Sequence, residues 1–138
     1  MAECRETYAY FFVRSFECDS HEITRLLGFA PDEAHNRGEE YPSGRKRKNA
    51  TWKRFSKLPR STPDVSDHLE ALLPILETYR ENILQVAAGY CVGLQCVGYY
   101  TGVHPGFHMS SELLRRVSGL ELSIDFDLYC YCAGEGSD

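Results

Sequence analysis

The chain has 138 residues, of which 43% are apolar and 25% charged, and it carries a formal net charge of −5. These values predict one globular domain, large enough to bury a core without metal ions or disulfides. The acidic balance argues against general coating of nucleic acid, because phosphate neutralisation needs a basic surface. Residues 1–7 are charged, and no apolar run is long enough to span a membrane. We therefore expect a cytoplasmic protein without a secretory signal.

The six cysteines show none of the closely spaced C-x2-C pairs that structural zinc sites use. We expect most of them to be small buried hydrophobic residues in a reducing compartment. The sequence therefore predicts no disulfide framework, no metal and no cofactor.

The first predicted element is a strand over Tyr8–Phe16, which is rich in aromatic residues. Both of its faces are largely apolar, so we expect it at the centre of a sheet or in a sheet covered on both sides. A helix follows from Asp19 to Gly28, because Asp19 and Glu22 form a capping-box pattern and Gly28 is a typical helix end.

The segment Pro31–Ala50 is polar, lacks periodicity and changes from acidic to basic. A loop of this length is usually functional or mobile, and we expect a mobile one. Thr51–Ser56 predicts a short second strand, with Trp52 as its anchor.

Apolar residues at helical spacing predict the longest helical region within residues 62–89. Pro74 interrupts this pattern, so we expect a kink at Pro74 or two abutting helices. A third strand is predicted over Tyr90–Tyr100. A third helix is predicted over residues 110–118, which begin with two serines that can cap a helix.

The last strand is predicted over Leu122–Cys132, because apolar and polar residues alternate strictly in its sequence LSIDFDLYCYC. Its apolar face, which includes Phe126, is expected to be core. Its other face carries Asp125, Asp127, Tyr129 and Tyr131. Ala133–Asp138 is expected to be a flexible tail.

These elements predict a single α+β domain over residues 1–138, with a folded core at 8–132 and the order β-α-β-α-β-α-β. We expect a mostly antiparallel four-stranded sheet with helices on one face. The sequences Ser20–Gly28 and Ser110–Gly119 resemble each other, and each follows a strand and a loop. Either the domain is a pseudo-symmetric repeat, or these are two ordinary amphipathic helices with common caps.

Five short motifs follow one another along the chain, at Asp19–Gly28, Gly44–Trp52, Asp67–Leu73, Ser111–Arg115 and Asp125–Tyr129. In their order the chain resembles the bacterial family DUF4279, a domain of unknown function, from Tyr8 to Cys132. The resemblance implies a single small cytoplasmic α+β domain. It implies no activity, cofactor or catalytic residue, so the function has to be inferred from candidate sites.

Asp125 and Asp127 form the first candidate site, because they are two apart on one strand face. Paired carboxylates can share a proton, bind a divalent cation or act as acid and base. Two carboxylates are few for calcium or magnesium. The alternative, which we favour, is a solvated face or an ion pair with Arg14 or Arg115.

A tyrosine strip is the second candidate site. It consists of Tyr129, Tyr131 and Tyr99, with Tyr10 on a neighbouring strand. Phenols combine apolar area with a polar tip, which suits a recognition surface. If helices cover this face, the same tyrosines are core residues instead.

Eight positive charges near Trp52 form the third candidate site. They are Arg45, Lys46, Arg47, Lys48, Lys53, Arg54, Lys57 and Arg60. Basic residues beside an aromatic ring can hold a nucleic acid or an acidic protein. No nucleic-acid-binding motif is present, so nucleic acid is not the expected partner. A solvated loop is the alternative that we favour.

His104 and His108 have a spacing that metal ligands often show, but Pro105 and Gly106 between them argue against a continuous helix and a shared site. We therefore interpret them as polar loop residues.

The leading hypothesis is a non-catalytic binding protein that recognises a protein partner through the aromatic–acidic strand face and the Pro31–Ala50 loop. A toxin-immunity or similar regulatory role fits this profile by analogy. The competing hypothesis is a metal-dependent or acid/base enzyme that uses Asp125 and Asp127. The oligomeric state and the identity of the partner stay open.

Overall fold

The computed structural model describes residues 3–102 and 106–131, and of residues 3–5 only the backbone. These residues form one α+β domain, as predicted. Its elements are β1 (Glu3–Arg14), α1 (Ser20–Leu27), β2 (Glu33–His35), β3 (Thr51–Phe55), α2 (Val65–Thr78), α3 (Arg80–Gly89), β4 (Cys91–Thr101), α4 (Ser111–Gly119) and β5 (Ile124–Tyr131). No helix within the described ranges is long and apolar enough to cross a membrane. The predicted tail at 133–138 lies outside the described residues.

The sheet has the strand order β2-β3-β1-β4-β5. Neighbouring strands are antiparallel from β2 to β4, whereas β4 and β5 are parallel. The sheet is mostly antiparallel, as predicted, but the predicted four strands and the order β-α-β-α-β-α-β are not matched exactly. β2 forms inside the segment that lacked periodicity, and β5 runs parallel to β4. The parallel pairing is possible because α4 lies between the two strands and returns the chain across the sheet.

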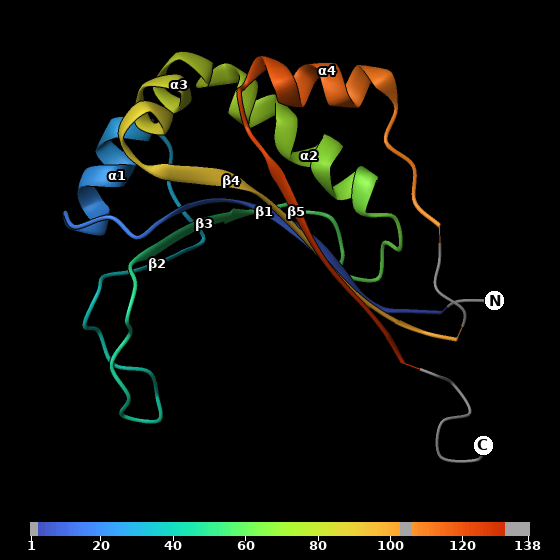
Figure 1. The fold of residues 1–138 in the computed structure, drawn as a ribbon, viewed down its shortest axis with the longest axis horizontal. Helices are drawn as coiled ribbons and strands as arrows, with labels where there is room; N and C mark the ends of the chain where they lie inside the picture. The colour runs from blue at the N-terminus through green and yellow to red at the C-terminus, as the bar shows by residue number, and fades with distance from the viewer. Residues whose placement is uncertain (1–2, 103–105, 132–138) are drawn as a thin grey trace.

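All four described helices lie on one side of the sheet, and the loop between β2 and β3 projects on the other side (Figure 1). The predicted single helical face is thus confirmed, and β1 occupies the predicted central position. The expectation of a sheet covered on both sides is wrong for the described part of the chain. On the apolar second face of β1, aromatic rings pack against one another.

Two similar halves are visible only in the order of the elements. β1-α1-β2 and β4-α4-β5 each read strand, helix, strand, and in each the second strand is parallel to the first. However, β3 is inserted between β1 and β2, whereas β4 and β5 are direct neighbours. The two halves are therefore unequal, and α2 and α3 have no counterpart in the order β1-α1-β2.

The core lies between the helices and the helix-facing side chains of the central strands. Phe11 on β1 and Leu94 on β4 are opposite each other in the register and fully buried. Trp52 on β3 is also fully buried, and its ring contacts Phe11 edge-on at 5.9 Å. The prediction that Trp52 anchors the second strand is confirmed. Its place among the predicted binding residues is corrected, because a buried ring in the helix-covered layer has no surface to offer a partner.

The long helical region is divided into α2 and α3, but the break lies at Tyr79 and not at Pro74. α2 continues past Pro74, where the hydroxyl of Thr78 donates a hydrogen bond of 2.8 Å to the Pro74 carbonyl oxygen. Tyr79 leaves the helical conformation, with φ −106° and ψ 26°, and its ring packs on Phe29 at 5.1 Å. The break between the two helices therefore lies where the Tyr79 ring packs on Phe29, and not at Pro74.

The cysteines differ from the expectation that most are buried. Among the described side chains Cys96 is buried, Cys18 is half-buried, and Cys91 and Cys130 are exposed. Burial raises the pKa of the Cys96 thiol to about 12, so this group is an uncharged part of the core at neutral pH.

The apolar face of β5 is less buried than predicted. Phe126 is 38% exposed, and Ile124 and Leu128 are only partly buried. The reason is that β5 is the last strand of the sheet and has a neighbour on one side only. Phe126 instead stacks on the exposed ring of Phe107 at 5.2 Å. The prediction that Phe126 is a core residue is therefore wrong.

Two phenylalanine-to-alanine variants compare the centre of the sheet with its edge. Phe11→Ala is expected to lower the free energy of unfolding by about 3–5 kcal/mol, because it leaves a cavity in a closed core. Phe126→Ala is expected to cost about 1 kcal/mol, because its ring is partly hydrated already. Urea denaturation measures both, and equal losses would contradict the edge position of Phe126.

His68 on α2 is a buried polar residue that connects the end of β3 to the start of α2. Its Nε2 lies 3.1 Å from the Thr62 carbonyl oxygen, and its Nδ1 lies 2.7 Å from the Ser56 hydroxyl. A carbonyl oxygen only accepts, so Nε2 carries the hydrogen and Nδ1 of the neutral ring accepts from Ser56. Burial lowers the pKa of His68 below its usual value, which favours this neutral form.

The neutral state of His68 predicts a pH dependence of stability. Above about pH 6.5 the ring is neutral in the folded and unfolded states, and it adds no pH dependence. Below about pH 6.5 the unfolded state takes up the proton first, so the free energy of unfolding falls until the lowered folded-state pKa is passed. Urea denaturation at a series of pH values should show this loss in the wild type and in His21→Gln, but not in His68→Gln.

Candidate functional site

The face of the sheet that carries no helix is the candidate site, and we call it the open face. Its residues follow from the strand register, in which Tyr10 is opposite Phe55 on one side and Gln95 on the other. The residues that share this face include Tyr8, Tyr10, Phe12, Arg14, Lys53, Phe55, Gln95, Val97, Tyr99, Asp125, Asp127, Tyr129 and Tyr131.

Rings from β1 and β3 pack against one another on the open face. The ring centroids of Tyr10 and Phe55 are 5.2 Å apart, and Tyr8 lies 5.9 Å from Phe55. Phe12 contacts Tyr10 edge-on at 6.2 Å and is almost fully buried without any helix above it. Mutual packing of large rings thus accounts for the apolar character of this face of β1.

Cationic side chains lie over these rings. Lys53 Nζ is 4.7 Å from the centroid of Tyr10, and the guanidinium of Arg14 is 4.4 Å from that of Phe12. The negative face of an aromatic ring attracts a cation, so these contacts hold positive charge close to the sheet. The alternation of β1 carries the sequence signal for this group, because it predicts two apolar faces, either in a sheet covered on both sides or in a central strand.

A second pair of rings lies on β4 and β5. Tyr99 and Tyr129 are paired in the register, and their rings stack at 5.0 Å with an interplanar angle of 12°. Tyr129 and Tyr131 are 45% and 46% exposed, so no helix covers the tyrosine strip. Tyr10, the fourth member of the predicted strip, belongs to the group on β1 and β3.

The two ring groups adjoin each other. Burial raises the pKa of Tyr8, and the neighbouring Tyr99 raises it further. Burial likewise raises the pKa of Tyr10, and the Asp127 carboxylate on β5 contributes to this increase. Val97, which is opposite Tyr8 in the register, is buried on this face. The open face therefore carries aromatic rings on four neighbouring strands, in two groups that lie near each other.

The carboxylates of Asp125 and Asp127 have different partners. Asp125 lies 3.9 Å from the guanidinium of Arg14, which is one of the two ion pairs that we considered. Asp127 accepts a hydrogen bond of 2.9 Å from the side-chain amide of Gln95. The described residues contain no group of three or more His, Cys, Asp or Glu side chains that could hold a metal ion. His108 is an exposed loop residue, and His104 lies outside the described residues.

Within the predicted Pro31–Ala50 loop, residues 36–50 form a hairpin, and the mobility of this segment stays a prediction. Its two arms are joined by backbone hydrogen bonds, from Arg47 N to Glu39 O at 2.7 Å and from Tyr41 N to Arg45 O at 2.7 Å. Arg47 also lies over the ring of Tyr41 at 4.1 Å. The hairpin continues from the paired strands β2 and β3, so backbone pairing forms in a segment without side-chain periodicity.

The eight predicted cations separate into two sets. Lys53 lies over Tyr10, Arg54 donates to the Ala30 carbonyl oxygen, Lys57 pairs with Asp32, and Arg60 pairs with Glu6. The other four, Arg45, Lys46, Arg47 and Lys48, line a hollow of about 750 Å³ on the hairpin. No carboxylate lines this hollow, and none of its four cations has an ion pair within the described part of the chain.

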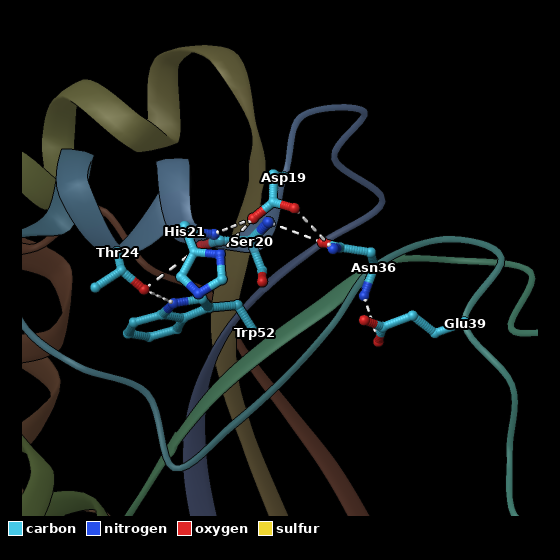
Figure 2. Close-up of polar contacts among 7 residues, drawn as sticks. All are labelled: Asp19, Ser20, His21, Thr24, Asn36, Glu39 and Trp52. Carbon is cyan, nitrogen blue, oxygen red and sulfur yellow. Dashed lines mark hydrogen bonds and ion pairs between the residues drawn. The ribbon is translucent and has the colours of Figure 1, made fainter.

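A polar network attaches the hairpin to the start of α1 (Figure 2). Asp19 caps α1 by accepting a hydrogen bond of 2.8 Å from His21 N. The side chain of Asn36 accepts from Ser20 N at 2.8 Å and donates to Asp19 at 3.0 Å. Asn36 therefore connects the beginning of the hairpin to one backbone N–H and one side chain at the N-terminus of α1.

The same network reaches the core through Thr24. The indole nitrogen of Trp52 donates a hydrogen bond of 3.0 Å to the Thr24 hydroxyl, so α1 is joined to β3. On the other side, Glu39 accepts a hydrogen bond of 2.8 Å from Asn36 N and closes the base of the hairpin. Figure 2 shows these contacts in one line from the buried Trp52 to Glu39.

Two comparisons with known proteins find nothing, and one finds a family. The family model described as "Domain of unknown function (DUF4279)" matches residues 5–131. No curated protein and no solved structure matches the chain.

Asn36→Ala tests whether this network holds the hairpin. The variant removes both side-chain bonds and leaves Ser20 N without its partner, so the free energy of unfolding should fall by about 1–3 kcal/mol. Trypsin should cut the hairpin at residues 45–48 faster than in the wild type. Asn49→Ala is the matched control, since Asn49 is exposed on the same hairpin, and it should change neither value. An unchanged cleavage rate in Asn36→Ala would show that the hairpin is held by its backbone bonds alone.

Proposed function

Because the chain belongs to the DUF4279 family, a domain of unknown function, its role has to be inferred from its own surface, and we propose that it is a non-catalytic binding protein that recognises a protein partner. The partner contacts the open face and the basic hairpin together. An immunity-like or regulatory role, in which the partner is held rather than converted, is of this kind.

The observation that carries this proposal is the set of aromatic rings that four neighbouring strands bring to the open face. Single exposed apolar residues are common, but contiguous ones on a soluble protein typically mark an interaction surface. Tyrosine is also enriched at interfaces, because it offers a large apolar ring and a polar tip. Tyr129 and Tyr131 present both features to the solvent.

The charges on this side of the molecule indicate the chemistry of the partner. The hairpin projects on the side of the open face (Figure 1) and carries four cations without carboxylate partners. Asp125 and Asp127 lie at the other end of the sheet order, on β5. The complementary partner therefore has carboxylates that face the hairpin and an apolar or basic surface that faces β4 and β5.

The enzyme hypothesis receives less support from the same geometry. An acid/base or metal-dependent mechanism needs both carboxylates to converge on one substrate or ion. Asp125 is engaged by Arg14 and Asp127 by Gln95, and both acids are on an exposed strand face. A broad face with separate partners favours binding over catalysis.

Charge reversal of the hairpin tests this proposal. Changing Arg45, Lys46, Arg47 and Lys48 to Glu should slow association with the partner and reduce its dependence on salt. Exposed charges act mainly on the association rate, and they are screened beyond a Debye length of about 8 Å at physiological ionic strength. The partner is first identified by affinity capture and mass spectrometry, and association rates are then measured against ionic strength.

Two matched controls separate a local effect from a general one. Changing Arg25, Arg80, Arg115 and Arg116 to Glu alters the net charge equally, but on the helices. On the open face, Tyr129→Ala should speed dissociation, whereas Leu114→Ala, which removes an exposed apolar residue of α4, should not. Equal rates and salt slopes in both charge-reversal variants, together with a silent Tyr129→Ala, would overturn the proposal.

A further inference from the structure

The two edges of the sheet are not protected equally. Natural edge strands are usually short, bulged, covered or marked by Lys or Pro, because an unpaired edge can add another strand. β2 at one edge has only three residues. β5 at the other edge has eight residues, no Lys, no Pro and no register shift against β4. Among the described residues, no strand lies beyond β5.

Exposed apolar side chains also gather at β5. Six large hydrophobic side chains of the described chain are exposed, and four of them belong to β5 or stack on it. These four are Phe107, Phe126, Tyr129 and Tyr131. They lie on both faces of the strand, so they form a border along the edge rather than a patch on one face.

The hydrogen bonds to β4 fix which backbone groups of β5 point outward. Leu94 N donates to the Ser123 oxygen, and Gly102 N donates to the Tyr131 oxygen, both at 2.9 Å. The odd-numbered residues of this stretch therefore direct their N–H and C=O groups toward β4. The even-numbered residues, from Ile124 to Cys130, direct theirs away from the sheet.

We propose that β5 pairs antiparallel with β5 of a second copy of this chain, with the two-fold axis at Leu128. The pairing joins the two five-stranded sheets into one continuous sheet and satisfies the outward backbone groups of both edges. The interface is isologous, as a two-fold symmetric dimer requires.

The charges of β5 select this register. Antiparallel pairing of the outward groups requires even-numbered residues to be opposite even-numbered ones. Two such registers give the longest overlap between the two copies of β5. Their two-fold axes lie at Asp127 and at Leu128. An axis at Asp127 places this carboxylate opposite its own copy, which is destabilising. An axis at Leu128 places Asp127 opposite Tyr129 and Asp125 opposite Tyr131, so that each carboxylate meets a phenol.

The dimer is compatible with the proposed function and does not depend on it. A two-fold axis perpendicular to the sheet keeps both open faces on the same side. Tyr99, Tyr129 and the two acids of each copy then lie near the centre of a doubled surface. Phe126 is opposite Cys130 on the helix-facing side, where both are exposed in the single chain.

Disulfide trapping tests the register. Leu128→Cys, in a chain where Cys130 and Cys132 are replaced by Ser, places two thiols opposite each other across the axis. Opposite residues in such a hydrogen-bonded pair have Cα atoms about 5.5 Å apart, which a disulfide can span. Mild oxidation should give a covalent dimer whose 128–128 link is identified by mass spectrometry. The matched control, Leu114→Cys on α4, should give no comparable dimer.

Sedimentation equilibrium tests the dimer without new thiols. The wild type and Cys130→Ser should sediment as dimers. Cys130→Pro should sediment as a monomer with an unchanged far-UV circular dichroism spectrum, because proline removes one outward N–H and leaves the bonds to β4 intact. A wild type that stays monomeric at all concentrations would overturn the proposal. A dimer that survives Cys130→Pro, or that yields no 128–128 link, would overturn pairing through β5.

Discussion

The pairing of β1 with β4 is the constraint on which the rest of the structure depends. These two central strands are antiparallel over nearly their whole length, and each has its helix-facing side chains in the core. Because side chains alternate along a strand, the register that buries Phe11 against Leu94 also directs Tyr10 and Gln95 to the open face. A slip of one strand by one residue would turn its core side chains to the open face and its open-face side chains to the core. The aromatic surface and the core are therefore two consequences of one register.

The hairpin depends on a second, more local connection to this core. Trp52 is held by close packing against Phe11, and its indole nitrogen is bonded to Thr24 on α1. From the start of the same helix, Asn36 and Asp19 position the base of the hairpin. These contacts of Trp52, Asp19 and Asn36 fix the position of the hairpin. The hairpin carries four cations, although the chain as a whole has a negative net charge. The hairpin that carries these cations projects on the side of the open face (Figure 1).

β5 is the last strand of the sheet and runs parallel to β4. It brings Asp125 and Asp127 to the open face, and its outer edge has no neighbouring strand among the described residues. With one neighbour only, β5 buries its apolar residues incompletely, and Phe126 packs on Phe107 instead of the helices. The same strand carries Asp125, Asp127, Tyr129 and Tyr131, so recognition at the face and pairing at the edge would use adjacent groups of one element. The proposed binding and the proposed self-association therefore involve the same strand.

The sequence by itself determined the local elements, the α+β class and the sharing of faces along each strand. Capping residues gave α1 and α4, and strict alternation gave β5 with its two carboxylates on one side. Only the tertiary structure decided which face the helices cover, that β5 is a parallel edge strand, and that Trp52 is core. It also decided that the segment after α1 is a hairpin and that eight clustered cations belong to two sets. The physical reason is that caps and periodicity are local, whereas strand order, burial and ion pairing depend on residues far apart in the chain.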